Sequence, residues 1–100
     1  MYIRYTTESS RRWSITPDEE AFLAALEAAL RQGHKSVALT ISRMANGALS
    51  VNSPRAYMGK INLQGRKTWM QYIARNDAEV IEGAPLEEYI HHLSFWVRSA

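Results

Sequence analysis

Short runs of alternating apolar and polar residues, separated by tight-turn signals, fill the middle of the chain and constrain its fold most strongly. From Ser36 to Met44 the residues alternate cleanly, with Leu39 and Ile41 on one side. A period of two is typical of a strand with one buried face. We expect three further strands in this part of the chain, over residues 48–53, 57–64 and 67–74.

The turns between these runs also predict how the strands pair. Asn46-Gly47 is the strongest short signal for a hairpin. A three-residue loop over 45–47 pairs Ile41 with Val51 and keeps the apolar residues on one side, whereas a two-residue loop mixes the faces. We therefore predict a type I turn with a bulge at Gly47.

A second hairpin is expected around Gly65-Arg66. Pairing about this turn sets Ile61 opposite Met70. The other side then receives a mainly polar set, which consists of Lys60, Asn62, Trp69, Gln71 and Ile73. Residues 76–77 turn again, and a short strand over 79–82 can follow.

Two amphipathic helices are predicted on either side of this meander. The first runs over residues 17–32, because Thr16 and Glu19 form a capping-box pattern and Pro17 suits the first helical position. The second begins at Pro85 and continues to about Ser99. Its apolar stripe consists of Leu86, Tyr89, Ile90, Leu93, Trp96 and Val97, with Phe95 on the opposite side.

The first residues of the chain are expected to form a hairpin from strands over 2–7 and 12–16, with a turn at 8–11. The predicted order is β-β-α-β-β-β-β-α. This order indicates a single α+β domain over residues 1–100, a two-layer sandwich with a mainly antiparallel sheet of five or six strands and two helices on one face. The strand over 36–44 puts Ala38, Thr40 and Ser42 on its second face, which we expect to be open to water or a partner.

Composition excludes several classes of protein. The absence of cysteine excludes disulfide scaffolds, Cys-ligated zinc and thiol catalysis. No apolar run reaches the roughly 18–20 residues of a membrane span, and the first residues lack the layout of a signal peptide. We expect a small soluble protein, most simply cytoplasmic.

Charge is distributed unevenly along the chain. Residues 28–76 contain no Asp or Glu but eight Lys or Arg, whereas acids flank this stretch on both sides. One interpretation is compensation, in which acidic helices lie against a basic sheet or scattered charges stay solvated. The alternative is a surface that faces an anionic partner.

Motifs for catalysis and metal binding are missing. His91 and His92 are adjacent on the predicted helix and point about 100° apart, so they do not share a metal without distortion. The carboxylates cluster in first helical turns, where they complement the helix dipole. The sequence contains no nucleophile elbow and no phosphate-cradling loop. We expect no enzyme, no cofactor and no metal.

The predicted function is therefore a small binding protein of the inhibitor, immunity or adaptor type. We expect a basic sheet face to engage an acidic protein through Trp69, Lys60, Arg66, Lys67, Arg43 and Arg55. Single-stranded or structured nucleic acid is the alternative, since bases stack on aromatic side chains beside Lys and Arg. A homodimer with a contact at Phe95 is the third hypothesis.

Overall fold

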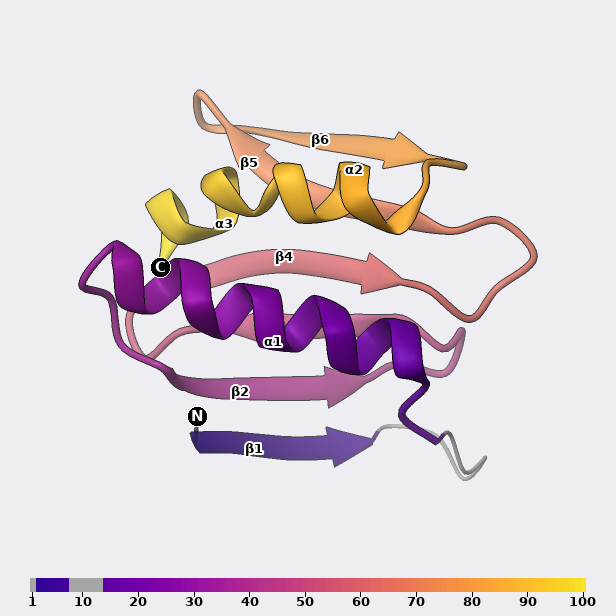
Figure 1. The fold of residues 1–100 in the computed structure, drawn as a ribbon, viewed down its shortest axis with the longest axis horizontal. Coiled ribbons are helices and arrows are strands. Elements are labelled where there is room, and N and C mark those ends of the chain that lie inside the picture. The colour runs from indigo at the N-terminus through magenta and orange to yellow at the C-terminus, as the bar shows by residue number, and fades with distance from the viewer. Residues whose placement is uncertain (1, 8–13) are drawn as a thin grey trace.

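Six strands form one sheet in the order of the sequence, and three helices pack with them (Figure 1). The computed structural model describes residues 2–7 and 14–100. Its strands are β1 (Tyr2–Thr7), β2 (Ala38–Arg43), β3 (Leu49–Asn52), β4 (Tyr57–Asn62), β5 (Trp69–Ala74) and β6 (Asp77–Glu82). Its helices are α1 (Pro17–Gln32), α2 (Leu86–His91) and α3 (Leu93–Ser99).

The predicted α+β class and mainly antiparallel sheet are confirmed. Strands β2 to β6 form an antiparallel meander. At one edge, β1 runs parallel to β2, because α1 connects them and a helical crossover brings the chain back in the same direction. At the other edge, β6 exposes its three carboxylates, from Asp77, Glu79 and Glu82.

The described part of the predicted N-terminal hairpin contains its first strand but not its second. Residues 8–13, which carry its turn and the start of its second strand, lie outside the described residues. Residues 14–16 are described and are not in a strand. The alternating pattern predicted a strand at Ile15. Instead, Thr16 is the N-cap of α1, and Ile15 is exposed. The described neighbour of β1 is β2.

The turn between β2 and β3 has the predicted geometry. Ile41 lies opposite Val51, as the three-residue loop requires. The Met44 N–H donates to Ala48 O at 2.8 Å, and the Gly47 N–H donates to Met44 O at 3.0 Å. Gly47 adopts a φ of 91°, which places it in the left-handed region of the predicted bulge.

The register of β4 with β5 is also confirmed. Ile61 lies opposite Met70 and faces the core, while the alternate pairs are Lys60 with Gln71 and Asn62 with Trp69. An irregularity near the start of β4 pairs Val51 with Gly59 but Asn52 with Tyr57. The extra residue between them, Met58, is fully buried in the core.

The core lies between the sheet and the helices. Its most buried members come from α1, from the inward positions of β2 to β5 and from the last two helices: Phe22, Leu26, Leu30, Leu39, Ile41, Leu49, Val51, Met58, Ile61, Met70, Tyr89 and Trp96. The predicted stripe of the C-terminal helix supplies Tyr89, Leu93 and Trp96 to this core. That segment is divided at His92, whose ψ of −2° interrupts the α-helical repeat.

Trp96 requires a glycine in the sheet. Its indole N–H donates to Gln71 O of β5 at 2.9 Å, and the ring edge with Nε1 and Cε2 lies against Gly59 of β4. A Cβ at Gly59 would stand 2.5 Å from the indole nitrogen and 2.2 Å from Gln71 O. Because these distances leave no room for a side chain, only glycine allows α3 this close to β4 and β5.

A buried ion pair joins α1 to the sheet. Arg43 at the end of β2 donates to both carboxylate oxygens of Glu19, at 2.7 and 3.1 Å, and to Gly47 O at 2.8 Å. Neither side chain is exposed to solvent. Gln64, after β4, adds a third donor to Glu19 at 2.7 Å. The pair therefore ties the start of α1 to the β2–β3 turn and to the segment that follows β4.

The capping box of α1 is formed as predicted. The Glu19 N–H donates to Thr16 Oγ1 at 3.2 Å, and the Thr16 N–H donates to the Glu19 carboxylate at 3.0 Å. We expect Thr16→Ala to reduce the free energy of unfolding by roughly 0.5–2 kcal/mol, because it removes the oxygen that accepts from Glu19. Chemical denaturation measures this change. An unchanged midpoint would show that the cap contributes nothing.

Substitution of Arg43 should reduce the free energy of unfolding much more than substitution of an exposed arginine. We expect Arg43→Met to reduce the free energy of unfolding by roughly 3–5 kcal/mol, because it leaves the Glu19 carboxylate buried without its charge partner. Arg31→Met is the matched control. Arg31 lies 3.7 Å from Glu27 on the surface of α1, and its loss should cost less than about 0.5 kcal/mol. Equal losses in the two variants would contradict this interpretation.

The same pair predicts a dependence of stability on pH. Burial by itself would raise the pKa of Glu19, but hydrogen bonds from Arg43, Thr16 and Gln64 and the charge of Arg43 outweigh it and lower the pKa. A lowered pKa means stabilisation that is complete above the unfolded-state pKa and is lost as pH falls through the folded-state pKa.

We expect the difference in unfolding free energy between wild type and Glu19→Gln to narrow as pH falls from about 7 to about 3, because protonation removes the charge that the variant lacks. Denaturation series at several pH values measure it. A difference that stays constant with pH would argue against a charged Glu19.

Candidate functional site

The strands β2 to β5 present a second, mainly polar set of side chains on the side of the sheet away from the core. In Figure 1 the helices lie in front of the sheet, and α3 contacts β4 and β5 from that side. Eight of the residues of alternate parity lie around the centre of this side: Thr40, Ser42, Ser50, Asn52, Tyr57, Lys60, Trp69 and Gln71. We call these eight residues the open face.

A row of directly opposed residues crosses the centre of the open face. Ser42 pairs with Ser50, Ser50 with Lys60, and Lys60 with Gln71. Gln71 in turn lies opposite Val80 of β6, which is 51% exposed. Lys60 therefore stands in the middle of the sheet, with short polar side chains on one side and an exposed apolar residue near the other end of the row.

Two aromatic residues flank this row. Trp69 lies opposite Asn62 and is the diagonal neighbour of Lys60 across the β4–β5 pair; its side chain is half-buried. Tyr57 is also half-buried, and its hydroxyl donates to Gln71 Oε1. Burial raises the pKa of the Tyr57 hydroxyl, so it remains a neutral donor at physiological pH. The open face thus combines one lysine with two aromatic side chains.

Lys60 has no ion-pair partner among residues 14–100, and the four strands of the open face carry no Asp or Glu. The nearest carboxylate by register is Glu82 of β6, opposite Trp69. Glu82 is already bound by Lys67 at 2.9 Å, and this contact raises the pKa of the Lys67 ammonium. The positive charge at Lys60 is therefore not neutralised within the sheet.

Arg43 does not belong to a partner-binding surface. The prediction that it lies on a basic face is wrong, because Arg43 continues the inward parity of Leu39 and Ile41 and is fully buried against Glu19. The signal for this pairing was present in the alternation of β2, since a buried arginine needs a carboxylate partner. Of the two interpretations of the charge pattern, neutralisation of a sheet residue by an acidic helix therefore describes Arg43, whose charge is paired with Glu19 of α1.

Of the remaining predicted contacts, Arg66 and Lys67 adjoin the open face beside Trp69, whereas Arg55 lies away from it. Arg66 and Lys67 are exposed in the β4–β5 connection, at one end of β4. Arg55 is exposed in the β3–β4 connection, at the opposite end of the same strand. The structure therefore brings Lys60 and Trp69 together, keeps Arg66 and Lys67 at the adjoining loop, and separates Arg55 from both.

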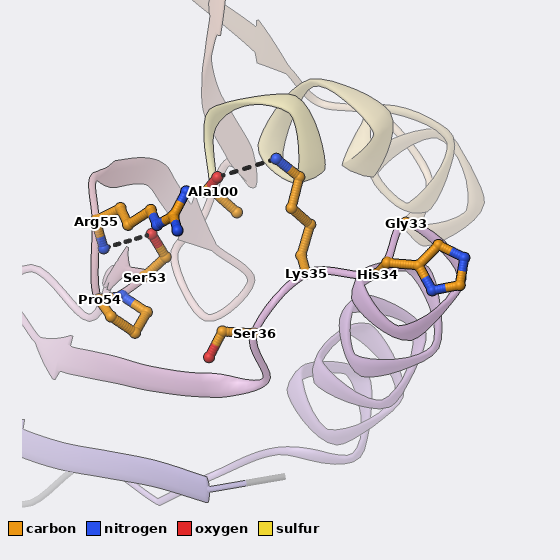
Figure 2. A pocket seen from close by; sticks show the side chains of 8 residues that line it. All are labelled: Gly33, His34, Lys35, Ser36, Ser53, Pro54, Arg55 and Ala100. Carbon is orange, nitrogen blue, oxygen red and sulfur yellow. Dashed lines mark hydrogen bonds between the residues drawn. The ribbon is translucent and has the colours of Figure 1, made fainter.

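Arg55 instead lines a pocket that the sequence did not reveal (Figure 2). The pocket has a volume of about 420 Å³ and lies between the end of α1, the β3–β4 connection and Ala100. Its other lining residues are Gly33, His34, Lys35, Ser36, Ser53 and Pro54. The three lining segments, 33–36, 53–55 and Ala100, are far apart in the sequence, so spacing along the chain gave no sign of their proximity.

Phe95 contacts the sheet of its own chain. Its ring stacks on Tyr72 of β5 with centroids 4.6 Å apart, and Arg98 Cζ lies over the Phe95 ring, 5.4 Å from its centroid. His92 completes the group, 5.2 Å from Tyr72. The helical wheel put Phe95 on an outer face because it did not include β5, which lies beside that face. A dimer contact at Phe95 stays a prediction.

Residues 14–100 contain no group of three or more His, Asp or Glu side chains placed to hold a metal ion. His91 is exposed, and His92 Nδ1 lies 2.8 Å from Glu88 O. None of the described helices has the length and apolar character needed to cross a membrane.

Comparison with known proteins adds no assignment: no protein-family model matches the chain, and no similar curated protein or solved structure is found.

Proposed function

We propose that this chain is a non-enzymatic binding protein that holds an acidic protein partner on the open face. The observation that carries this proposal is the position of Lys60, a lysine without an ion-pair partner among residues 14–100, beside Trp69 on strands that carry no carboxylate. The proposed two-layer arrangement, with the helices on the other side of the sheet, leaves this face available to the partner.

Each part of the open face has a role in such a complex. Trp69 supplies apolar area and serves as the anchor, since tryptophan is enriched among the residues that dominate binding energy. Lys60 supplies charge complementarity to a carboxylate on the partner, which speeds association and fixes orientation. Ser50, Asn52 and Gln71 offer hydrogen-bonding groups around this centre.

An acidic protein fits this face better than a nucleic acid does. Proteins that hold single strands line a groove with several bases that follow the phosphates. Here Arg43 is buried with Glu19, Lys67 is bound to Glu82, and Arg55 lies at the far end of β4. One central lysine beside one tryptophan suits a local carboxylate more than an extended phosphate backbone.

Substitutions on the open face should abolish binding without unfolding the protein. We expect Trp69→Ala to reduce the affinity for the captured partner by roughly 30-fold or more, because it removes the central anchor. Lys60→Glu should weaken the same complex in a salt-sensitive way. The partner is captured from lysate with and without nuclease, and affinities are then measured by calorimetry at two salt concentrations.

Arg31→Glu is the matched control, because it makes the same charge change on the exposed surface of α1 and should leave the affinity unchanged. Melting curves of all three variants verify that they fold. A ligand removed by nuclease, with a steep loss of affinity in salt, would identify nucleic acid as the partner and overturn the proposal. Unfolding of Trp69→Ala would show instead that Trp69 belongs to the core.

A further inference from the structure

We infer that the pocket between α1 and the β3–β4 connection is a binding site for a small molecule that carries a phosphate group. This site is independent of the open face, because none of the open-face residues lines it. Its volume of about 420 Å³ lies within the range of small-ligand sites in proteins.

The pocket is built where two helix ends meet. Gly33, the C-cap of α1, packs so closely on α3 that a Cβ at this position would stand 2.9 Å from Val97 Cγ1. The chain then turns sharply through His34, whose φ of 57° is left-handed. This turn directs Lys35 back toward Ala100, while the His34 ring points away from the pocket (Figure 2).

Positive charge is concentrated at this pocket. Lys35 comes from one wall and Arg55 from the opposite wall, and in Figure 2 both side chains reach toward Ala100. No Asp or Glu side chain lines the pocket, because both walls belong to the acid-free part of the sequence. An anion that enters therefore meets two cationic side chains and no Asp or Glu side chain, and it competes for Lys35 with the Ala100 oxygen.

The donors of these two side chains are largely unused. The Arg55 guanidinium makes no hydrogen bond or ion pair with another residue of the described chain; its contact with Ser53 Oγ, at 3.2 Å, is made by the backbone N–H. Lys35 Nζ makes a single, exposed hydrogen bond, to Ala100 O at 3.3 Å. Each group can turn its N–H donors to a ligand without breaking a buried contact.

A phosphate group matches this pair of side chains. The planar guanidinium offers parallel N–H donors that bind two oxygens of one phosphate, and the lysine adds a point charge beside it. The Ser36 hydroxyl accepts from the Ala38 N–H at 3.1 Å and still has its own O–H to donate. A singly charged carboxylate would use fewer of these donors, so we expect the pocket to prefer phosphate.

The test is an NMR titration of the full chain with inorganic phosphate, pyrophosphate and acetate at constant ionic strength. We expect phosphate and pyrophosphate to shift the amide signals of Gly33, Lys35 and Arg55, and to saturate, while acetate binds more weakly. Arg55→Ala should weaken phosphate binding by roughly tenfold, the usual loss for a charge-assisted hydrogen bond pair. Because the Arg55 side chain has no described contact to lose, the variant should keep the wild-type melting temperature.

Arg66→Ala is the matched control, since it removes an exposed arginine at the other end of β4 and should leave phosphate binding unchanged. Equal weakening by the two variants, or shifts spread over all exposed lysines and arginines, would mean nonspecific attraction of anions and would overturn the inference. An equal response to acetate would overturn the assignment to phosphate.

Discussion

The buried contact between Glu19 and Arg43 is the interaction on which the arrangement of helix and sheet depends. A carboxylate taken out of water is costly unless its oxygens are fully hydrogen-bonded. Here Arg43, Gln64 and the Thr16 N–H all donate to it. The donors come from β2, from the segment after β4 and from the start of α1. A shift of α1 relative to β2 would leave a buried charge without its partner, and a shift of the segment after β4 would remove a further donor. The ion pair thereby selects one placement of α1 over the sheet.

Turn motifs and alternation predicted the structure correctly where residues close in sequence determine the strand register. Asn46-Gly47 and the alternation around it were enough for the β2–β3 register, because only one loop length keeps Ile41 and Val51 on the same face. The first strand was predicted to pair with its neighbour in sequence, yet its described partner is β2. Pairing across a 16-residue helix depends on tertiary packing, which the alternation within the strand does not encode.

The candidate site was predicted only in part, for a related reason. Register placed Lys60 and Trp69 on one face, and the structure has them there. Charge counted along the sequence did not distinguish Arg43, which is buried, from Arg55, which lines a pocket with residues of another loop. The absence of acids from a stretch of sequence gives its net positive charge. It does not show on which side of each strand a given Lys or Arg lies, and the function depends on that side.

The acidic side chains of β6 affect whether another strand can pair with this edge of the sheet. An edge strand offers unpaired backbone N–H and C=O groups to any other strand. If two copies joined through β6 in full antiparallel register, Asp77 of each copy would stand opposite Glu82 of the other. Like charges directly opposed across a strand pair are destabilising. The carboxylates of β6 thus oppose the growth of one continuous sheet from molecule to molecule through this pairing.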